Sequence, residues 1–347
     1  MSTSDLLEGI EARRIPALAR AISLIENQRD GYEELLSAIH PRVGRAHRIG
    51  LTGPPGGGKS TLAERVIHIY RARERSVAVV AVDPTSPFSG GALLGDRIRM
   101  ESLTLDPEVF IRSMASRGEL GGVAMTTREV CDLLDAYGFD RIIIETVGVG
   151  QSELTIAAAA DTSVLVLTPE SGDGVQVLKA GVMEIADIFT INKADRPGAD
   201  RLRLEIEVML GIRKGKAHGN IAPHHGLPGG KARETATEGV AGAGWEPPAL
   251  AVSATRNEGV EELVDAIERH ARHLHTSGEL DRRRHERLAR HTREVVDRSL
   301  RHFVWQERNG EAALAAGLEE MVGGTMTPYQ VARDIVAGLR QETSNGR

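Results

Sequence analysis

The chain has 347 residues, of which 38 are glycine and only 3% are aromatic, and its formal net charge is −6. The one cysteine, Cys131, excludes an intramolecular disulfide. The negative charge argues against broad, non-specific binding of nucleic acid. No run approaches the roughly 18 apolar residues that span a bilayer, and the charged N-terminus lacks a signal-peptide core. We therefore expect a cytoplasmic protein with neither nucleic acid nor a membrane as its partner.

The first 45 residues are expected to form an N-terminal helical segment. Apolar residues recur at helical spacing in two stretches, one at Leu18, Ile22 and Ile25 and one at Leu35, Leu36 and Ile39. Pro41 then ends the pattern. We expect residues 1–45 to fold as a helical hairpin that packs on the domain that follows.

Short β-branched runs alternate with helical stretches over residues 46–275. The predicted strands are Ile49–Thr52, Val77–Val82, Phe110–Ile111, Arg141–Glu145, Ser163–Thr168, Ile188–Asn192 and Ala249–Ser253. This alternation predicts an α/β fold with a mostly parallel sheet covered by helices on both faces. Ligands of such sheets bind beyond the carboxyl ends of the strands, and the motifs described below follow these strands.

Two further stretches depart from this pattern. Residues 211–248 carry little apolar periodicity and many Gly, Pro and Ala residues, which predicts a flexible insertion. Its His218, His224 and His225 could bind a metal, but a solvated loop is the simpler interpretation. Residues 276–347 predict a C-terminal helical arm, whose apolar face must be buried on the domain or on another subunit; that face carries Leu288, Val295, Leu300 and Val304.

A glycine-rich motif follows the first predicted strand: Gly53-Pro54-Pro55-Gly56-Gly57-Gly58-Lys59-Ser60-Thr61. It matches G-x-x-x-x-G-K-[ST] between a strand and a helix, which is the context that this motif requires. Backbone N–H groups of the loop and the helix N-terminus can surround phosphates, and Lys59 can reach the β- and γ-phosphates. Ser60 offers its hydroxyl to Mg²⁺. The motif predicts a nucleotide site of the P-loop type.

A second motif, Asn192-Lys193-Ala194-Asp195, fits N-K-x-D and follows the strand that ends near Ile191. Asp195 can accept hydrogen bonds from N1–H and the exocyclic amine of guanine, whereas adenine would leave the carboxylate unpaired. Ser253 and Ala254 supply a further loop on the guanine side. We therefore expect GTP and GDP as ligands in preference to ATP, and a P-loop GTPase domain over residues 46–275.

Three acidic residues are candidates for the magnesium site beside Ser60. Asp83 and Glu145 lie at the ends of predicted strands, Asp96 lies in the segment Gly95–Met100, and such carboxylates hold Mg²⁺ directly or through water. Gly148 can approach the γ-phosphate with its N–H, and its loop can change shape on hydrolysis. No glutamine is a clear candidate for positioning the attacking water. We therefore expect slow hydrolysis that a partner accelerates.

Together these motifs resemble those of the MeaB/MMAA family, the G-protein chaperones of adenosylcobalamin-dependent acyl-CoA mutases, whose bacterial members were once labelled ArgK kinases. The matching segments include Gly53–Thr61, Asp83–Pro87, Gly90–Arg97, Glu145–Glu153, Gly172–Gln176 and Asn192–Asp195. The resemblance covers roughly residues 10–275. The string E-T-V-G-V-G-Q-S-E is quite specific to this family.

The resemblance implies roles for individual residues. Ser60, Asp83, Asp96 and Glu145 correspond to the magnesium site, and the catalytic and signalling groups are Lys59, Glu145, Gly148 and Lys179. Segment 171–187 corresponds to an additional switch that contacts the mutase, with Lys179 as its signalling lysine. Such proteins form homodimers through C-terminal helices. They use GTP hydrolysis, which the mutase stimulates, to gate loading of the cobalamin cofactor and removal of the damaged cofactor.

The sequence departs from the family pattern in two places, and two other functions stay open. The insertion 211–248 is longer than expected, and Val264 stands where a tryptophan is common, so the identity of the partner mutase is left open. A P-loop kinase is the first alternative, but most such kinases use ATP, against which N-K-A-D argues. A nickel-delivery GTPase is the second, and it would need a Cys or His cluster near the switches.

Overall fold

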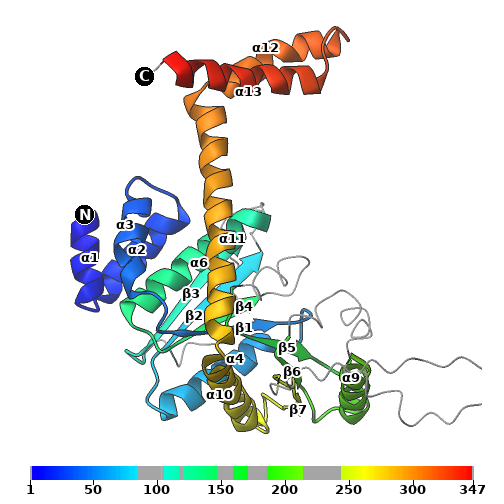
Figure 1. Cartoon of the computed structure of the whole chain (residues 1–347). Coiled ribbons are helices and arrows are strands. Elements are labelled where there is room, and N and C mark those ends of the chain that lie inside the picture. Colours follow the sequence, from blue (N-terminus) through cyan, green and yellow to red (C-terminus); the bar gives the residue numbers. More distant parts are fainter. Residues whose placement is uncertain are drawn as a thin grey trace, which may run out of the picture. The chain divides into compact units, whose positions relative to one another are not determined.

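The structure is a computed structural model that describes residues 2–84, 103, 105–116, 120–146, 159–170, 186–213 and 244–345. Its centre is one seven-stranded sheet with the order β3-β2-β4-β1-β5-β6-β7 (Figure 1). The strands are β1 (His47–Thr52), β2 (Val77–Pro84), β3 (Val109–Ser116), β4 (Arg141–Thr146), β5 (Thr162–Leu167), β6 (Ile188–Ile191) and β7 (Ala249–Ala251). Each neighbouring pair is parallel, which confirms the expected α/β fold.

Two helices cover one face of the sheet. Helices α4 (Lys59–Ala72) and α10 (Val260–Ser277) share a buried core with alternate strand residues, such as Ile49 and Leu51 of β1. Because side chains alternate along a strand, the residues between them point to the other face. This packing fixes α4, the helix that begins at the glycine-rich motif, directly against the central strand.

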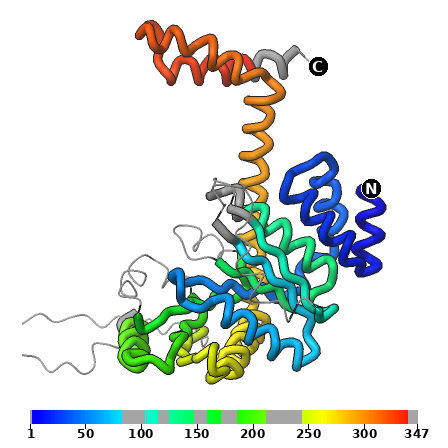
Figure 2. Tube along the Cα trace, turned by 180° about the vertical axis from the view of Figure 1, so that it is seen from behind, coloured from blue at the N-terminus to red at the C-terminus, as the bar shows by residue number. Residues whose placement is uncertain are grey.

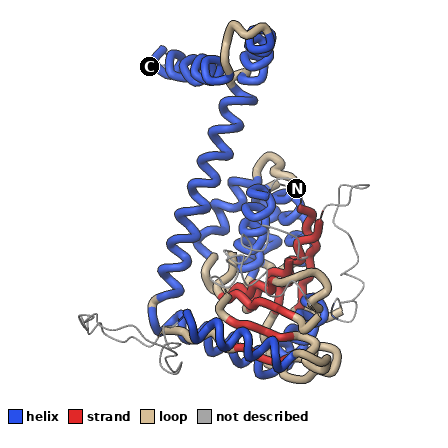
Figure 3. The backbone as a smooth tube through the Cα atoms, turned by 90° about the vertical axis from the view of Figure 1, so that its right-hand side faces the viewer, coloured by secondary structure: helices blue, strands red, loops and turns tan. Residues whose placement is uncertain are grey.

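The opposite face is covered by helices over both halves of the sheet. Helix α6 (Leu120–Tyr137) packs over β2 and β4, and α9 (Ala199–Arg213) packs over β5 and β6. Figure 3 shows the strands in red between the blue helices of these two layers. Helices on both faces explain why the central strands are apolar on both sides and read as continuous runs in the sequence.

Three helices precede the sheet, where the sequence predicted a hairpin of two. They are α1 (Thr3–Glu11), α2 (Ile15–Glu26) and α3 (Tyr32–Ile39). The additional helix, α1, begins with a capping box in which Ser2 and Asp5 each accept a backbone N–H of the other. Helices α2 and α3 pack against α6, as the blue and teal tubes of Figure 2 show. The segment is therefore part of the core on this face.

The parallel pairing places the carboxyl ends of the strands along one edge of the sheet. Leu51 of β1 aligns with Glu145 of β4 and with Val164 of β5. On the other side of β4, Ala81 of β2 also aligns with Glu145. The segments that follow β1, β2, β4 and β6 consequently start close together, and this edge carries the candidate site.

Arg284–Arg347 form a second compact unit. Helix α11 (Glu279–His302) continues into it and is followed by a π-helical turn (Phe303–Glu307), α12 (Gly310–Val322) and α13 (Pro328–Asn345). Helices α12 and α13 pack closely, because a Cβ at Gly317 would lie only 2.8 Å from a methyl of Val331. Large apolar side chains of this hairpin are exposed, namely Leu318, Val322, Tyr329 and Val336.

The stretch 211–248 is described only at its two ends. Residues 211–213 continue α9 instead of starting a loop, and at the other end Trp245 packs beside α10. The indole Nε1–H donates to the backbone oxygen of Asp187 over 2.7 Å. Residues 214–243, with the three histidines considered above, lie outside the described residues. No helix in the described part of the chain is long and apolar enough to cross a bilayer.

Candidate nucleotide site

The glycine-rich loop between β1 and α4 packs against backbone and side chains from later in the chain. A Cβ at Gly53, where φ is +136°, would lie 2.0 Å from the carbonyl oxygen of Val166 in β5. A Cβ at Gly58, where φ is +79°, would lie 2.5 Å from Nδ2 of Asn192. Both positions therefore require glycine. The loop leads directly into the N-terminus of α4, whose first N–H groups have no partner within the helix and favour an anion.

Lys59 is the first residue of α4 and is only 5% exposed. Its Nζ donates to the carbonyl oxygens of Gly53 over 2.7 Å and Pro54 over 3.0 Å. The ammonium is thereby held against the loop by two hydrogen bonds to its backbone. A positive charge at this depth interacts more strongly with phosphate than a solvated one would.

The next residue, Ser60, contacts the end of β4. Its Oγ donates to Oε1 of Glu145 over 2.6 Å, and Glu145 is 2% exposed. Asp83 is close by in the sheet, because β2 lies beside β4 and Ala81 aligns with Glu145 two residues earlier. Two of the four residues expected at a magnesium site are thus in contact, and a third, Asp83, lies near the end of the adjacent strand.

Asn192 joins the phosphate loop to the loop that follows β7. Its Nδ2 donates to the carbonyl oxygen of Gly57 over 2.8 Å, and its Oδ1 accepts from the backbone N–H of Ala254 over 3.2 Å. The side chain is buried, at 2% exposure. The sequence predicted this asparagine as a nucleotide-binding residue. The structure places it as a bridge between the two loops that would hold the nucleotide.

Asp195 and Ser253 meet on the other side of this bridge. The hydroxyl of Ser253 donates to Oδ1 of Asp195 over 2.8 Å, and this hydrogen bond holds the pKa of the Asp195 carboxyl below its ordinary value. Arg256 lies 3.7 Å from the second carboxylate oxygen. Asp195 is therefore an ionised acceptor, as recognition of two guanine donors requires.

Two basic residues, Lys193 and Arg65, lie near the loops on the guanine side of the site. Lys193 has a left-handed backbone, with φ +57°, and its Nζ lies 3.6 Å from Glu170. Arg65 of α4 donates from Nε to the carbonyl oxygen of Ala254 over 3.1 Å and thereby supports the last loop of the site. Nothing in the sequence singled out Arg65, because its partner lies 189 residues away.

The remaining expected site residues fall into two groups. Pro55 and Gly56 lie in the phosphate loop, and Thr61 lies in the first turn of α4. Asp96, Gly148 and Lys179 lie outside the described residues. The site that the structure brings together thus comprises the phosphate loop, the Ser60–Glu145 pair and the Asn192–Asp195 and Ser253–Ala254 loops.

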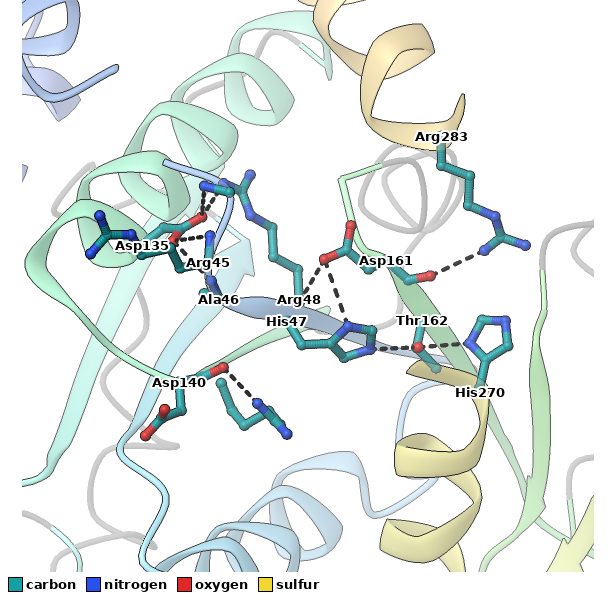
Figure 4. Close-up of polar contacts among 12 residues, drawn as sticks. Arg45, Ala46, His47, Arg48, Asp135, Asp140, Asp161, Thr162, His270 and Arg283 are labelled. Carbon is teal, nitrogen blue, oxygen red and sulfur yellow. Dashed lines mark hydrogen bonds and ion pairs between the residues drawn. The ribbon is translucent and has the colours of Figure 1, made fainter. Parts of the chain in front are cut away.

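A buried polar network lies at the opposite edge of the sheet, where β1 and β5 begin (Figure 4). His47 Nε2 is 2.8 Å from the hydroxyl of Thr162, which is 2.7 Å from Nδ1 of His270. Burial lowers the pKa of His47 to about 4, which keeps its imidazole neutral at physiological pH. On α6, Asp135 accepts three backbone N–H groups, from residues 44 to 46, and so fixes the start of β1.

Asp187 extends this network to the base of α11. Its carboxylate accepts two hydrogen bonds from Arg283, at 3.0 and 3.1 Å, and one from the backbone N–H of Ser163 at 2.8 Å. His270 Nε2 lies 3.3 Å from the same carboxylate. Its neighbours hold the pKa of Asp187 below the ordinary value, although burial alone would raise it. These partners show that Asp187 has a structural role in holding β5, α10 and α11 together.

Comparison with known proteins identifies the family. The sequence matches the family described as methylmalonyl Co-A mutase-associated GTPase MeaB over residues 18–309. The chain belongs to the MeaB family. A protein of Pyrococcus abyssi that is named as a GTPase is 46% identical over 84% of this chain and 83% of its own length. The GTPase ArgK of Escherichia coli is 33% identical over 93% of this chain and 90% of its own.

A solved structure supports the same assignment. The crystal structure titled LAO/AO transport system kinase aligns with a TM-score of 0.66 and 26% identity, and the match covers 97% of both chains. As a member of the MeaB family, the chain is a P-loop GTPase that binds GTP and GDP and hydrolyses GTP. In the residues that the structure describes, no three His, Cys, Asp or Glu side chains gather as a metal site.

Proposed function

We propose that this GTPase gates the loading of cobalamin into an adenosylcobalamin-dependent acyl-CoA mutase and protects or reactivates that enzyme. The proposal rests on the match to a family described as methylmalonyl Co-A mutase-associated, over residues 18–309. The site geometry also supplies a physical link between the two loops that would hold the nucleotide. Asn192 ties the phosphate loop to the guanine-side loop, so a change at one is transmitted to the other.

In the proposed mechanism the phosphate half of the site positions GTP for hydrolysis. Backbone N–H groups of residues 53–58 and the α4 N-terminus bind the phosphate oxygens, and Lys59 neutralises charge that develops on them. Asp195, ionised and oriented by Ser253, accepts the two guanine donors. The chain thereby fixes both ends of the nucleotide, which is the main contribution a protein makes to phosphoryl transfer.

The donor set around Ser60 suits Mg²⁺. A hydroxyl and a carboxylate, both hard oxygen ligands, lie in contact at the end of β4. Asp83 lies near the end of the adjacent strand, at the same edge of the sheet. We assign Ser60, Glu145 and Asp83, together with Asp96, to the metal site. A bound Mg²⁺ would supply positive charge that stabilises the charge on the phosphates. Ser60 and Glu145 would orient the ion directly or through water.

The proposed coupling to the mutase uses three segments. Gly148 would contact the γ-phosphate, the segment 171–187 would contact the mutase, and Lys179 would carry the signal between them. Asp187, the last residue of that segment, is fixed by Arg283, His270 and Ser163. A switch that ends on an anchored residue can change shape without moving the core strands behind it.

The test is a pull-down with each adenosylcobalamin-dependent mutase encoded in the same genome, followed by GTPase assays with each captured enzyme. We expect one mutase to bind in a nucleotide-dependent manner and to raise the GTPase rate. Lys179→Ala should lose that stimulation. Lys59→Ala should lose nucleotide-dependent binding altogether. If no mutase binds the GTP, GDP or nucleotide-free protein, the proposed function is wrong.

We also propose a homodimer through the C-terminal helices, residues 276–347. Leu318 and Val322 of α12 and Tyr329 and Val336 of α13 are exposed, and a helical hairpin gains stability when such a surface is covered. Light scattering on the full chain should give the mass of a dimer. Leu318→Glu with Tyr329→Glu should give a monomer of unchanged helix content, whereas the exposed control Glu319→Gln should stay dimeric.

A further inference from the structure

A cavity lies at the end of α4 that is remote from the phosphate loop. It has a volume of about 410 Å³ and is formed by the last turn of α4, the start of β4 and the middle of α10. Since α4 has 14 residues, its two ends are about 20 Å apart. The cavity is thus separate from the nucleotide site, although both lie on the same helix.

Arginines dominate the lining of this cavity. Five of its residues are arginine and two are acidic; the arginines are Arg73, Arg75, Arg141, Arg269 and Arg272. In the lining itself arginines outnumber acidic residues by three, in a chain whose net charge is −6. Two acidic residues outside the lining, Glu261 and Asp140, lie near Arg73 and Arg75. Fields from like charges around a concave surface add, so the cavity attracts anions.

The two acidic residues neutralise only two of the five arginines. Asp265 lies 2.8 Å from Arg73, and Glu268 accepts two hydrogen bonds from Arg141 at 2.9 and 3.0 Å. These pairs also fix the positions of both guanidinium groups. The cavity therefore has a rigid wall in which the charges are already paired.

The remaining three arginines are available to a ligand. Arg75 is 53% exposed, and its ion pair, with Asp140, is long at 3.7 Å. Arg269 and Arg272 lie one turn apart on α10, both are exposed, and neither has an ion-pair partner among the described residues. Their five-donor planar groups suit oxyanions, which they bind through paired N–H···O contacts.

Tyr70 adds a polar group in the wall of the cavity. Its side chain is 1% exposed, and its hydroxyl makes no hydrogen bond of normal geometry with a described residue, although Arg141 and Glu268 lie beside it. The Arg141 guanidinium lies 5.4 Å from the centre of the Tyr70 ring. A buried hydroxyl that lies beside charged groups but outside normal hydrogen-bond geometry carries an energetic cost that a ligand oxygen can remove.

We propose that this arginine cavity binds a small polyanion with two or more phosphate or carboxylate groups. Arg269 and Arg272, together with Arg75 in its long ion pair, match several negative charges. The volume falls in the range of small-molecule sites, roughly 300–1,000 Å³. The buried hydroxyl in its wall favours a small ligand over an acidic segment of a protein, because a folded surface does not reach so deep. Arg269, Arg272 and Arg75 bind the outer charges, and Tyr70 donates to an inner oxygen.

The test titrates the full-length protein, saturated with GDP in buffer without free Mg²⁺, with tripolyphosphate and separately with citrate by isothermal calorimetry. Orthophosphate serves as the comparison with fewer charges. We expect one equivalent of tripolyphosphate or citrate to bind more tightly than orthophosphate. Comparing the tripolyphosphate titration with the citrate titration distinguishes a phosphate ligand from a carboxylate ligand. Affinity should fall steeply with salt, since the rim charges are exposed.

Variants assign the binding to the cavity. Arg269→Ala with Arg272→Ala should weaken it at least about tenfold, and Tyr70→Phe should weaken it several-fold while keeping the ring. Arg201→Ala with Arg203→Ala removes the same charge from exposed positions on α9 and should change nothing. Lys59→Ala should also leave it intact, which separates it from phosphate-loop binding. Unchanged affinity in the α10 double variant, or capture of polyglutamate but of neither small polyanion, would overturn the proposal.

Discussion

Ser60 Oγ donates a 2.6 Å hydrogen bond to Oε1 of Glu145, so the first turn of α4 and the end of β4 are joined side chain to side chain. The carboxylate is 2% exposed. A buried charge is retained only where partners compensate its loss of water. The hydroxyl is one such partner in this structure, and a divalent cation held by the same two groups would be a stronger one.

Glu145→Gln keeps the shape of this pair and removes its charge. We expect GTP turnover to fall on the order of 100-fold, and the Mg²⁺ concentration for half-maximal rate to rise, because a neutral amide is a poor ligand for Mg²⁺. Initial rates of phosphate release over a Mg²⁺ series measure both effects. Glu205→Gln on the surface of α9 is the matched control. An unchanged Mg²⁺ dependence would remove Glu145 from the metal site.

Asn192→Ala breaks the bridge between the phosphate loop and the loop after β7. The variant leaves the N–H of Ala254 without its side-chain acceptor and the Gly57 carbonyl without its donor. We expect the free energy of unfolding to fall by roughly 1–3 kcal/mol and GDP affinity to fall about tenfold. Denaturant titration and fluorescent-GDP binding measure the two effects. The control Asn27→Ala, at the exposed end of α2, should change neither quantity. If Asn192→Ala were as stable as the parent and bound GDP normally, the bridge would be dispensable.

Asp195→Asn changes the base that the site accepts. The amide offers one acceptor and one donor, which suits xanthine, with an oxygen where guanine has its amine. We expect GTP affinity to fall about 100-fold or more and affinity for xanthosine triphosphate to rise above it. Competition against a fluorescent nucleotide gives both constants. If the variant still binds GTP more tightly than xanthosine triphosphate, Asp195 does not determine which base is bound.

His47 makes the fold sensitive to acid. Its pKa is about 4 in the folded protein and about 6.5 when unfolded, so the unfolded state binds the proton first as pH falls. Stability from this group is complete above pH 6.5 and is lost towards pH 4, with about 2 kcal/mol gone at pH 5. Urea unfolding at pH 7 and pH 5 measures the difference.

His47→Gln keeps a hydrogen-bonding side chain near Thr162 but has no group that titrates in this range. Between pH 7 and pH 5 its free energy of unfolding should therefore fall by about 2 kcal/mol less than that of the parent. Acidic groups elsewhere titrate in both proteins and cancel in the comparison. Equal losses in the variant and the parent would mean that His47 is not the group responsible.

Motifs fixed by local chemistry were predictable from the sequence. The phosphate loop and N-K-x-D have short, defined spacings, so their residues could be named and their strands located from the apolar runs beside them. The expected strands are found in the structure because short β-branched runs that are apolar on both faces are typical of strands covered by helices on both sides of a sheet. Residues 1–45 are expected to be helical, but the sequence does not distinguish α1 as a separate helix, since its apolar positions, Leu6 and Ile10, form only one turn of pattern.

Contacts between distant residues could not be predicted in this way. Asn192 was expected to bind nucleotide, but its role as a bridge depends on residues 57 and 254, which only the folded sheet brings together. The support that Arg65 gives to the last loop could not be predicted for the same reason, and Asp187 was expected only as the end of the switch segment 171–187, not as a structural anchor. Val264 was noted as a departure from the family, and it is buried in a core against which Trp245 packs. The indole of Trp245 thus packs against this core, although it comes from a different position in the sequence than the tryptophan common in the family.

The bridge through Asn192 also bears on the order of events during synthesis. The phosphate loop ends at Thr61, but the guanine-side loop ends at Ala254, about 190 residues later. At typical translation rates of 5–20 residues per second this interval lasts about 10 to 40 s. Until Ala254 is made, Asn192 can contact the phosphate loop but not the loop that follows β7. The complete bridge can therefore form only after almost the whole GTPase domain has been synthesised.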